Sequence, residues 1–244
     1  MANEIATART FDLALSEKLE GCKDALPADF NKARFVQNAM ALLKDNENIR
    51  KYPPAMIMEG LMKAAYLGLD FSNKECYLVP YGNSLNYQTD YRGAKKLAKK
   101  YSIRPVKDIY AQLVREDDLF EIGIVDRETK LNFKPNPFSN KPIIGAFAVV
   151  IFEDGGMLYE TMSKDDLETS RRQSKASNSP AWKNFPGEMY KKTVLHRLCK
   201  HIELDFSPAQ RDAFMAGSEI ETDDRELSRR EIEEKANEVE FETV

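Results

Sequence analysis

The sequence predicts an α+β fold, a single domain in which a small antiparallel sheet and hairpins pack on several helices. Apolar residues follow helical spacing between about residues 29 and 68 and again near residues 188–201. Between residues 103 and 162, short β-type segments alternate with turn residues. Consecutive strands of this kind pair as an antiparallel meander, which indicates the α+β class.

Local signals place the expected helices. Asp29 or Asn31 is expected to cap a helix that runs to about residue 45, and Pro54 to begin a second helix that ends at Gly68. Ser163, followed by acidic residues, marks another helix start. The remaining helices are expected over residues 91–101 and 188–201.

Strand signals fill the intervening sequence. Gly82-Asn83 is expected to form the turn of a hairpin within residues 76–91. The most apolar segment, IIGAFAVVIF, is expected to be a central strand because it lacks a polar face. Further strands are expected in the segments VKDIYAQLV, LFEIGIV, KLNFKP and GMLYETM.

The sequence is expected to divide into an N-terminal arm, a core domain and an acidic tail. Residues 1–28, with a break at Gly21, predict an N-terminal arm or helix that contributes to an oligomer contact. Residues 29–217 form the core domain. Residues 218–244 are expected to form a flexible, disordered acidic tail.

Composition favours a protein of a reducing cytoplasm. No apolar run approaches the roughly 18–20 residues that a membrane span needs, and the first residues lack a signal-peptide core. Cys22, Cys76 and Cys199 are an odd number without CxxC spacing, so neither a disulfide framework nor a zinc site is expected.

Charge is segregated along the chain, although the formal net charge is only −4. Residues 219–244 contain eleven acids and four bases, which gives −7, while residues 1–218 contain 29 acids and 32 bases, which gives +3. A basic body with an acidic tail suggests binding to a polyanion or its regulation. A solvated tail on an ordinary domain is the alternative.

Two segments concentrate the basic residues. Residues 91–107 contain seven bases and no acid, and residues 171–200 contain eight bases and one acid. On a helix, the second segment is expected to place Lys192, His196 and Lys200 in one stripe. Cations along a track suit a phosphate backbone, because each neutralised phosphate releases counterions. Solvated helix faces are the alternative interpretation.

Aromatic residues interleave these bases. Proteins that bind single strands use such side chains to stack bases, at roughly 1–3 kcal/mol each. The alternative is that they belong to the core, and for Trp182 packing is the stronger interpretation. The aromatic candidates are Tyr81, Tyr87, Tyr91, Trp182, Phe185 and Tyr190.

Catalytic motifs are sparse. A GxxxxGK[ST] phosphate loop is absent, which argues against ATP-driven strand exchange. One enzyme alternative is a metal-dependent nuclease, in which the carboxylates of Asp117, Asp118, Asp126 and Glu128, together with Lys130, would hold Mg²⁺ and activate water. Exposed turn charges explain the same residues without catalysis.

Two long segments, GLMKAAYLGLDFSNKECYLVPYGNSLNYQTDYRGAKKLAKK and SPAWKNFPGEMYKKTVLHRLCKHIELD, resemble the RecT (RecT/Redβ) family of phage single-strand annealing recombinases. The resemblance covers about residues 30–205, with YLVPY, Tyr-Arg-Gly and AWxNFPxEMxxKTVxxR in the same order. It is similar to versions encoded by prophages of Gram-positive bacteria.

The resemblance implies a non-enzymatic, ATP-independent protein without metal or cofactor, which binds single-stranded DNA and anneals it in homologous recombination. It implies a homo-oligomer, as a ring or helical filament, that holds the annealed duplex and works with a phage exonuclease and a host single-strand binding protein. A coat protein that binds but suppresses annealing is the alternative. The expected DNA-binding residues are Tyr91, Arg92, Lys95, Lys99, Arg171, Arg172, Lys175, Trp182, Lys183, Lys191, Lys192 and Arg197.

Overall fold

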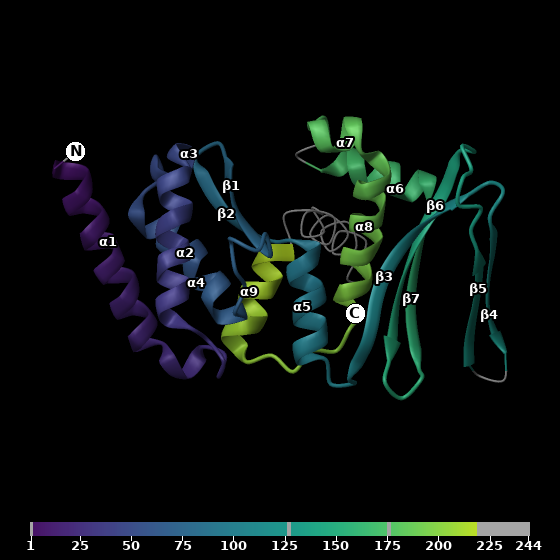
Figure 1. Cartoon of the computed structure of the whole chain (residues 1–244), viewed down its shortest axis with the longest axis horizontal. Coiled ribbons are helices and arrows are strands. Elements are labelled where there is room, and N and C mark those ends of the chain that lie inside the picture. The colour runs from purple at the N-terminus through teal and green to yellow at the C-terminus, as the bar shows by residue number, and fades with distance from the viewer. Residues whose placement is uncertain (1, 126–127, 175–176, 219–244) are drawn as a thin grey trace, which may run out of the picture.

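The computed structural model describes residues 2–125, 128–174 and 177–218, and it confirms the α+β class. Helices form one end of an elongated molecule, and a sheet with an additional hairpin forms the other (Figure 1). The chain begins with α1 (Ala2–Gly21), the 3₁₀ helix η1 (Lys23–Ala25), α2 (Lys32–Asp45), α3 (Glu47–Arg50), α4 (Pro54–Leu67), β1 (Cys76–Tyr81), β2 (Ser84–Thr89) and α5 (Tyr91–Tyr101). It continues with β3 (Val106–Arg115), β4 (Leu119–Val125), β5 (Glu128–Lys134), β6 (Ile143–Phe152), β7 (Met157–Ser163), α6 (Lys164–Gln173), α7 (Pro180–Asn184), α8 (Pro186–Lys200) and α9 (Pro208–Ser218).

The helix ends follow the predicted capping signals. The Asn31 side chain accepts a hydrogen bond of 2.9 Å from the backbone N–H of Arg34 and so caps α2. Pro54 occupies the first turn of α4, where a backbone N–H would have no acceptor within the helix, so proline costs no hydrogen bond there. Gly68 ends α4 at φ +65°, a left-handed conformation that favours glycine. Ser163 caps α6 in a capping box, also as predicted.

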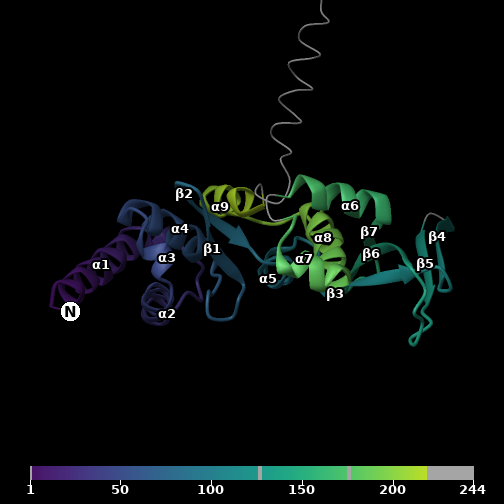
Figure 2. The ribbon, with the colours of Figure 1, turned by 90° about the horizontal axis from the view of Figure 1, so that it is seen from above.

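Three antiparallel sheets contain the described strands. The main sheet has the order β3-β6-β7, so the apolar segment at residues 143–152 is its central strand, as predicted. The predicted hairpin at Gly82-Asn83 joins β1 and β2, and a separate hairpin joins β4 and β5. Helices α6 and α8 lie along one side of the main sheet, with the β4–β5 hairpin at the far end of the molecule (Figure 2).

Strand β6 is buried on both faces, which explains its continuous apolar sequence. Ala148 and Val150 pack into a core with α5, α6 and α8. Phe147 points to the opposite face, where its ring lies 5.0 Å from that of Phe120 and 4.9 Å from that of Phe133. The β4–β5 hairpin therefore covers the face of the sheet that the helices leave open.

Helix α5 joins this core to a second one at the helical end of the molecule. The second core contains α1, α2, α4 and the inner face of the β1–β2 hairpin, with Leu15 and Leu61 fully buried in it. Leu97 of α5 packs into the helical core, while Ala94 and Ala98 pack into the sheet core. One helix therefore fixes how the two cores are placed.

Helix α9 has no counterpart among the predicted elements. It carries the chain back from the sheet to α4 and β2, where Ala213 enters the helical core (Figure 1). The side-chain amide of Gln210 donates to the backbone oxygen of Tyr66 at 3.2 Å and to the Tyr101 hydroxyl at 3.1 Å. The helical core is thus completed by residues about 150 positions away from its other helices.

None of the helices within the described ranges is long and apolar enough to cross a membrane. The acidic segment over residues 219–244 lies outside those ranges, so its predicted flexibility stays a prediction.

Gly93 is a position on α5 where a side chain has no room. A Cβ atom there would lie 2.2 Å from the backbone oxygen of Glu75 and 3.1 Å from Cδ1 of Leu69. We expect Gly93→Ala to lower the free energy of unfolding in urea by about 1–3 kcal/mol through overpacking. Gly123→Ala on β4, where nothing lies within 4 Å of the added Cβ, is the control. An equal loss of stability in both variants would contradict the close contact.

Candidate nucleic-acid interface

Helix α5 carries the first basic segment, and its ends and core face determine which side meets solvent. The Asp90 carboxylate caps the helix by accepting a hydrogen bond of 3.2 Å from the backbone N–H of Arg92. Ala94, Leu97 and Ala98 are buried. The basic side chains therefore occupy the outward half of the helix.

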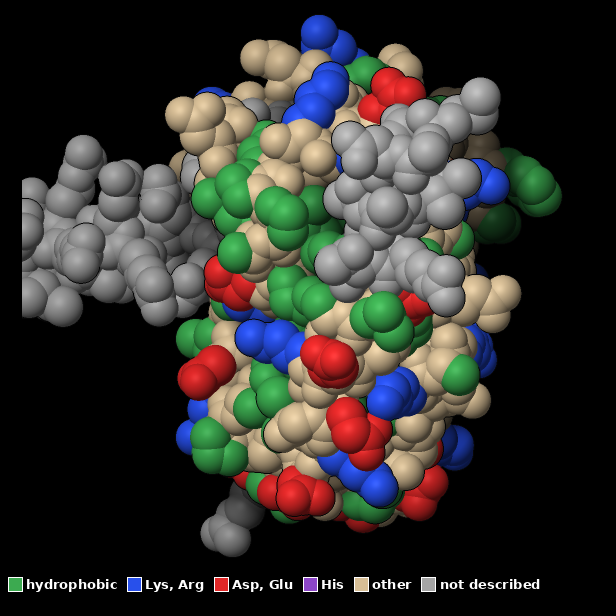
Figure 3. Space-filling model, turned by 90° about the vertical axis from the view of Figure 1, so that its left-hand side faces the viewer, with side chains coloured by type: hydrophobic (Ala, Val, Ile, Leu, Met, Phe, Trp, Pro, Cys, Tyr) green, Lys and Arg blue, Asp and Glu red, His purple; other side chains and the backbone are tan. Residues whose placement is uncertain are grey.

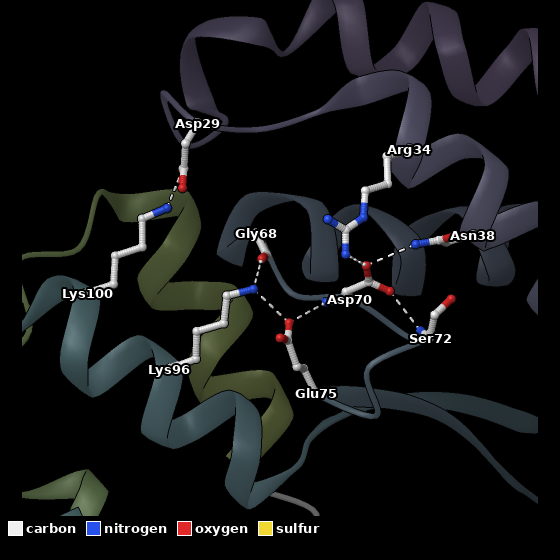
Figure 4. Close-up of polar contacts among 9 residues, drawn as sticks. All are labelled: Asp29, Arg34, Asn38, Gly68, Asp70, Ser72, Glu75, Lys96 and Lys100. Atoms are coloured by element: carbon white, nitrogen blue, oxygen red, sulfur yellow. Dashed lines mark hydrogen bonds and ion pairs between the residues drawn. The ribbon is translucent and has the colours of Figure 1, made fainter. Parts of the chain in front are cut away.

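One edge of this outward half is neutralised within the fold. The Lys96 ammonium lies 2.8 Å from the Glu75 carboxylate and donates to the backbone oxygen of Gly68 at 3.0 Å. Glu75 also accepts a hydrogen bond of 2.8 Å from the backbone N–H of Asp70, whose side chain binds Arg34 (Figure 4). This network braces α5 against the loop between α4 and β1.

Two further bases of the segment are paired with distant acids. Lys100 binds Asp29, which precedes α2 (Figure 4). The Arg104 guanidinium forks onto the Asp154 carboxylate, with N–O distances of 2.8–3.1 Å. Each of these two bases thus has an acidic partner at the surface.

The opposite edge of α5 keeps its charge. Arg92, Lys95 and Lys99 follow one another at i, i+3 and i+7, and no ion pair joins them to an acid in the part of the chain that the structure describes. Arg92 donates to the Tyr91 hydroxyl at 3.3 Å, a contact that raises the pKa of the Arg92 guanidinium. Helix α5 packs against α8. There, burial raises the pKa of the Cys199 thiol to about 12, while the charge of Lys95 opposes that rise.

Helix α8 is buried almost all round, which corrects the expected basic stripe. His196 is 6% exposed, and its Nε2 lies 3.1 Å from the backbone oxygen of Thr89. The prediction that His196 shares an exposed stripe with Lys192 and Lys200 is therefore wrong. The packing of α8 against the sheet, α5 and β2 leaves no wide basic face. Its buried residues are Tyr190, Val194, Leu195, His196, Leu198 and Cys199.

The predicted basic residues on α8 have acidic neighbours. Lys191 pairs with Glu188 at 2.6 Å, Lys192 lies 3.9 Å from Asp90, and Arg197 pairs with Glu160 at 2.8 Å. The Lys191–Glu188 pair is exposed, and such pairs contribute little stability, about 0–1 kcal/mol, so a phosphate could replace Glu188. Asp90 and Glu160 are only 10% and 17% exposed. The roles of these basic residues in DNA binding stay predictions.

The predicted DNA-binding residues of α6 and α7 include Trp182 and the basic residues near it in the sequence. This indole is 4% exposed and packs at 6.0 Å from the Tyr190 ring, so it has the packing role that the sequence also allowed. The Arg171 guanidinium lies 5.6 Å from the indole and binds Glu168. Arg172 binds the Thr169 hydroxyl at 2.9 Å, Lys183 is exposed, and Lys175 lies outside the described residues.

The exposed aromatic residues match only in part those that the sequence suggested. Tyr87 is 2% exposed and Tyr190 is 4% exposed, whereas Phe185 is 65% exposed where α7 meets α8. Tyr77 on β1 is 39% exposed and was not among the candidates. The alternation of β1 contained the signal, because Tyr77 lies between the buried residues Cys76 and Leu78.

The backbones of Asp117 and Glu128, two residues of the nuclease alternative, lie at opposite ends of the β4–β5 hairpin. Asp117 binds Ser139 and Asn136 in a turn before β4, which lowers the pKa of this carboxyl group. Glu128 pairs with Val125 at the opposite end of the hairpin, seven residues along β4 and roughly 20 Å away at about 3.3 Å per residue. No group of three His, Cys, Asp or Glu side chains suited to a metal occurs within the described ranges, and Asp126 lies outside them.

The fold and this surface define an α+β protein with a cationic helix edge suited to a nucleic-acid backbone. Residues 33–239 match the model of the RecT family. The chain is 27% identical over 190 residues to protein RecT of Escherichia coli strain K12, an alignment that covers 73% of this chain and 69% of that protein. It is 24% identical over 164 residues to the uncharacterized protein YqaK of Bacillus subtilis strain 168, covering 66% of this chain and 56% of YqaK.

The chain belongs to the RecT family, as its motifs indicated. Membership supports DNA binding and single-strand annealing in recombination.

The two edges of α5 are expected to respond differently to mutation. Lys96→Ala leaves the carboxylate of Glu75, which is 13% exposed, without its cation and should lower the free energy of unfolding by about 1 kcal/mol. Lys99→Ala removes an exposed charge and should change it by less than about 0.5 kcal/mol. Urea denaturation of both variants measures the difference. Equal stability of the two would contradict the structural role of the Lys96 edge.

Proposed function

We propose that the protein binds single-stranded DNA and anneals it to a complementary strand in homologous recombination, without ATP and without a catalytic residue. The observation that supports this function is the cation row on α5, which consists of Arg92, Lys95 and Lys99. The neighbouring Lys96 and Lys100 form ion pairs with Glu75 and Asp29. At about 1.5 Å rise per residue, the row spans roughly 10 Å of helix, enough for two consecutive phosphates. Its residues lie within a segment that matches the RecT family.

Annealing follows from contacts to the DNA backbone. A surface that holds phosphates reads no sequence, so complementarity is tested by base pairing with the second strand. Cations beside both strands reduce the repulsion between two polyanions. The protein thus brings two strands together, and base pairing between them determines whether the strands remain associated.

The working form is a homo-oligomer, a ring or helical filament, which turns a weak grip per subunit into a strong one along the strand and its annealed duplex. A filament requires a heterologous interface between different surfaces of neighbouring subunits. A phage exonuclease that exposes single strands and a host single-strand binding protein are the expected partners. The other proposed backbone contacts are Arg171, Arg172, Lys175, Lys183, Lys191, Lys192 and Arg197, which together with the cation row would form a basic groove.

Residues 1–28 remain the candidate for one side of this interface. Leu15 and Leu19 are buried in the helical core, but Leu13 on the same helix is 58% exposed. Viewed from the α1 end, the surface shows hydrophobic side chains among charges of both signs (Figure 3). A pocket of about 430 Å³ lies between α1, α4 and α9, lined in part by Lys18, Met58, Met62, Tyr66 and Ala213.

Annealing is tested with two complementary oligonucleotides that carry a fluorophore and a quencher, without ATP. The wild-type protein should accelerate pairing and leave both strands intact. The variant Arg92→Ala/Lys95→Ala/Lys99→Ala should lose most of this acceleration. The slope of its log–log salt dependence of single-strand binding should fall by about 0.7 per lost phosphate contact, roughly 1.4 for two phosphates.

A matched control separates position from net charge. Lys44→Ala/Lys51→Ala/Lys134→Ala removes three exposed lysines from α2, the segment after α3 and β5, and should anneal like the wild type. Equal loss in both triple variants would refute a localised cation row. Stable binding with slowed annealing would indicate a protective coat, and shortened strands would indicate a nuclease.

The interface role of α1 is tested by Leu13→Ser, because deletion of residues 1–28 would also remove buried Leu15 and Leu19. We expect a smaller assembly in sedimentation velocity, with an unchanged melting temperature. Leu119→Ser, at an exposed leucine on β4, is the control. An unchanged sedimentation profile for Leu13→Ser would count against an α1 interface.

A further inference from the structure

We propose that the outer face of the β1–β2 hairpin, with Tyr77 at the end away from the turn, is a subsite that stacks a nucleobase of the bound strand. The proposal rests on the DNA-binding function proposed above, and it deepens that function by assigning a contact to the bases as well as to the phosphates. Its ligand is an unpaired base of any type, because every base presents a flat π face.

The two faces of the hairpin differ in chemistry. The inner face is buried against the helical core and contains the register pairs Cys76–Thr89 and Leu78–Tyr87. The outer face contains the pairs Tyr77–Gln88, Val79–Asn86 and Tyr81–Ser84. Tyrosine rings beside amide and hydroxyl groups form a surface that suits a base, with an aromatic plane for stacking and polar groups at its edges.

Tyr77 lies next to cations from two other elements. Burial is the main cause that raises the pKa of Tyr77, and the Asp90 carboxylate adds to the rise, while the charges of Lys192 and Arg92 oppose it. Tyr77 pairs with Gln88, two residues before Asp90. The Asp90 carboxylate accepts a hydrogen bond of 3.2 Å from the backbone N–H of Arg92 on α5 and lies 3.9 Å from the Lys192 ammonium on α8. This end of the hairpin is therefore close to both helices. A strand whose phosphates contact Arg92 would carry its bases past the ring of Tyr77.

Accessible aromatic rings are present at Tyr77 and at Phe185, which is 65% exposed where α7 meets α8. Of the two, Tyr77 lies on the hairpin that leads directly into α5, the helix of the cation row. The Tyr77 ring is 39% exposed, whereas Tyr87, Trp182 and Tyr190 are 2–4% exposed and already pack against protein. Phe138 is 91% exposed but lies between β5 and β6, on the sheet side of the molecule. Tyr77 thus combines an accessible ring with adjacent cations.

Stacking on one face has a mechanistic advantage for annealing. A base held by its π face keeps its Watson–Crick edge available to the incoming strand, and stacking tolerates every sequence. A hydrogen-bonded base would instead have to release its edge before pairing. The subsite therefore holds a base in order without competing with the second strand.

The test compares single-strand affinities by fluorescence anisotropy on a short oligonucleotide and on an otherwise identical oligonucleotide in which abasic sites replace the bases. Tyr77→Leu should weaken binding of the normal strand by about 5- to 100-fold, the range of base–aromatic stacking. It should bind the abasic strand like the wild type. The salt dependence should remain that of the wild type, because no phosphate contact is removed.

Two variants serve as controls. Tyr77→Phe keeps the ring and should bind like the wild type. Phe138→Leu removes a more exposed aromatic ring on the sheet side of the molecule and should also bind like the wild type. An equal loss for Tyr77→Leu on normal and abasic strands, or no loss on either, would overturn the proposal.

A second measurement uses the unaltered protein and so does not depend on the folding of a variant. A strand that contains 5-iododeoxyuridine is irradiated in the complex, and the crosslinked peptide is identified by mass spectrometry. A crosslink at Tyr77 supports the subsite, and crosslinks confined to other peptides would contradict it. If the wild-type protein anneals strands but these results fail, only the subsite is refuted; if the wild type neither binds nor anneals, the proposed function itself is refuted.

Discussion

The packing of α5 between the two cores is the constraint on which the rest of the structure depends. Gly93 allows the helix to approach the backbone of Glu75, and the Lys96–Glu75 pair holds that side of the helix in place. Ala94 and Ala98 are small enough for α8 to approach the other side. Because each side of α5 is committed to a core, the row of cations on its outward half has a fixed direction.

Ion pairs within the fold neutralise one edge of α5 and leave the other edge positively charged, a difference that the count of charged residues does not show. Acids from three distant segments neutralise Lys96, Lys100 and Arg104. Arg92, Lys95 and Lys99 have no such partner within the described ranges. The positive charge that no acid of the described ranges neutralises is thereby concentrated along one edge of the helix.

Local patterns were sufficient to predict much of the fold. Asn31, Pro54, Gly68 and Ser163 mark helix ends by interactions within a few residues, and the apolar run of β6 marks a strand buried on both faces. Helix α9 was missed because its packing partners lie far away in the sequence.

The candidate site was harder to predict for the same reason. Lys100 and Asp29 are 71 positions apart, and Arg104 and Asp154 are 50 apart, so no local pattern tells which bases are neutralised. His196 appeared to continue a basic stripe, but β2, more than a hundred positions earlier, covers it. Tyr77 could have been selected from the alternation of β1, whereas its cationic neighbours could not.

The return of α9 to the helical core has a consequence for biosynthesis. The helices α1, α2 and α4 leave the ribosome early, yet Ala213 and Gln210, which close the surface over α4, are synthesised about 150 residues later. The nascent chain must therefore carry an incompletely covered apolar surface while the whole sheet is translated. A chaperone that shields this surface during translation would act on the N-terminal helices, and its release would coincide with the emergence of α9.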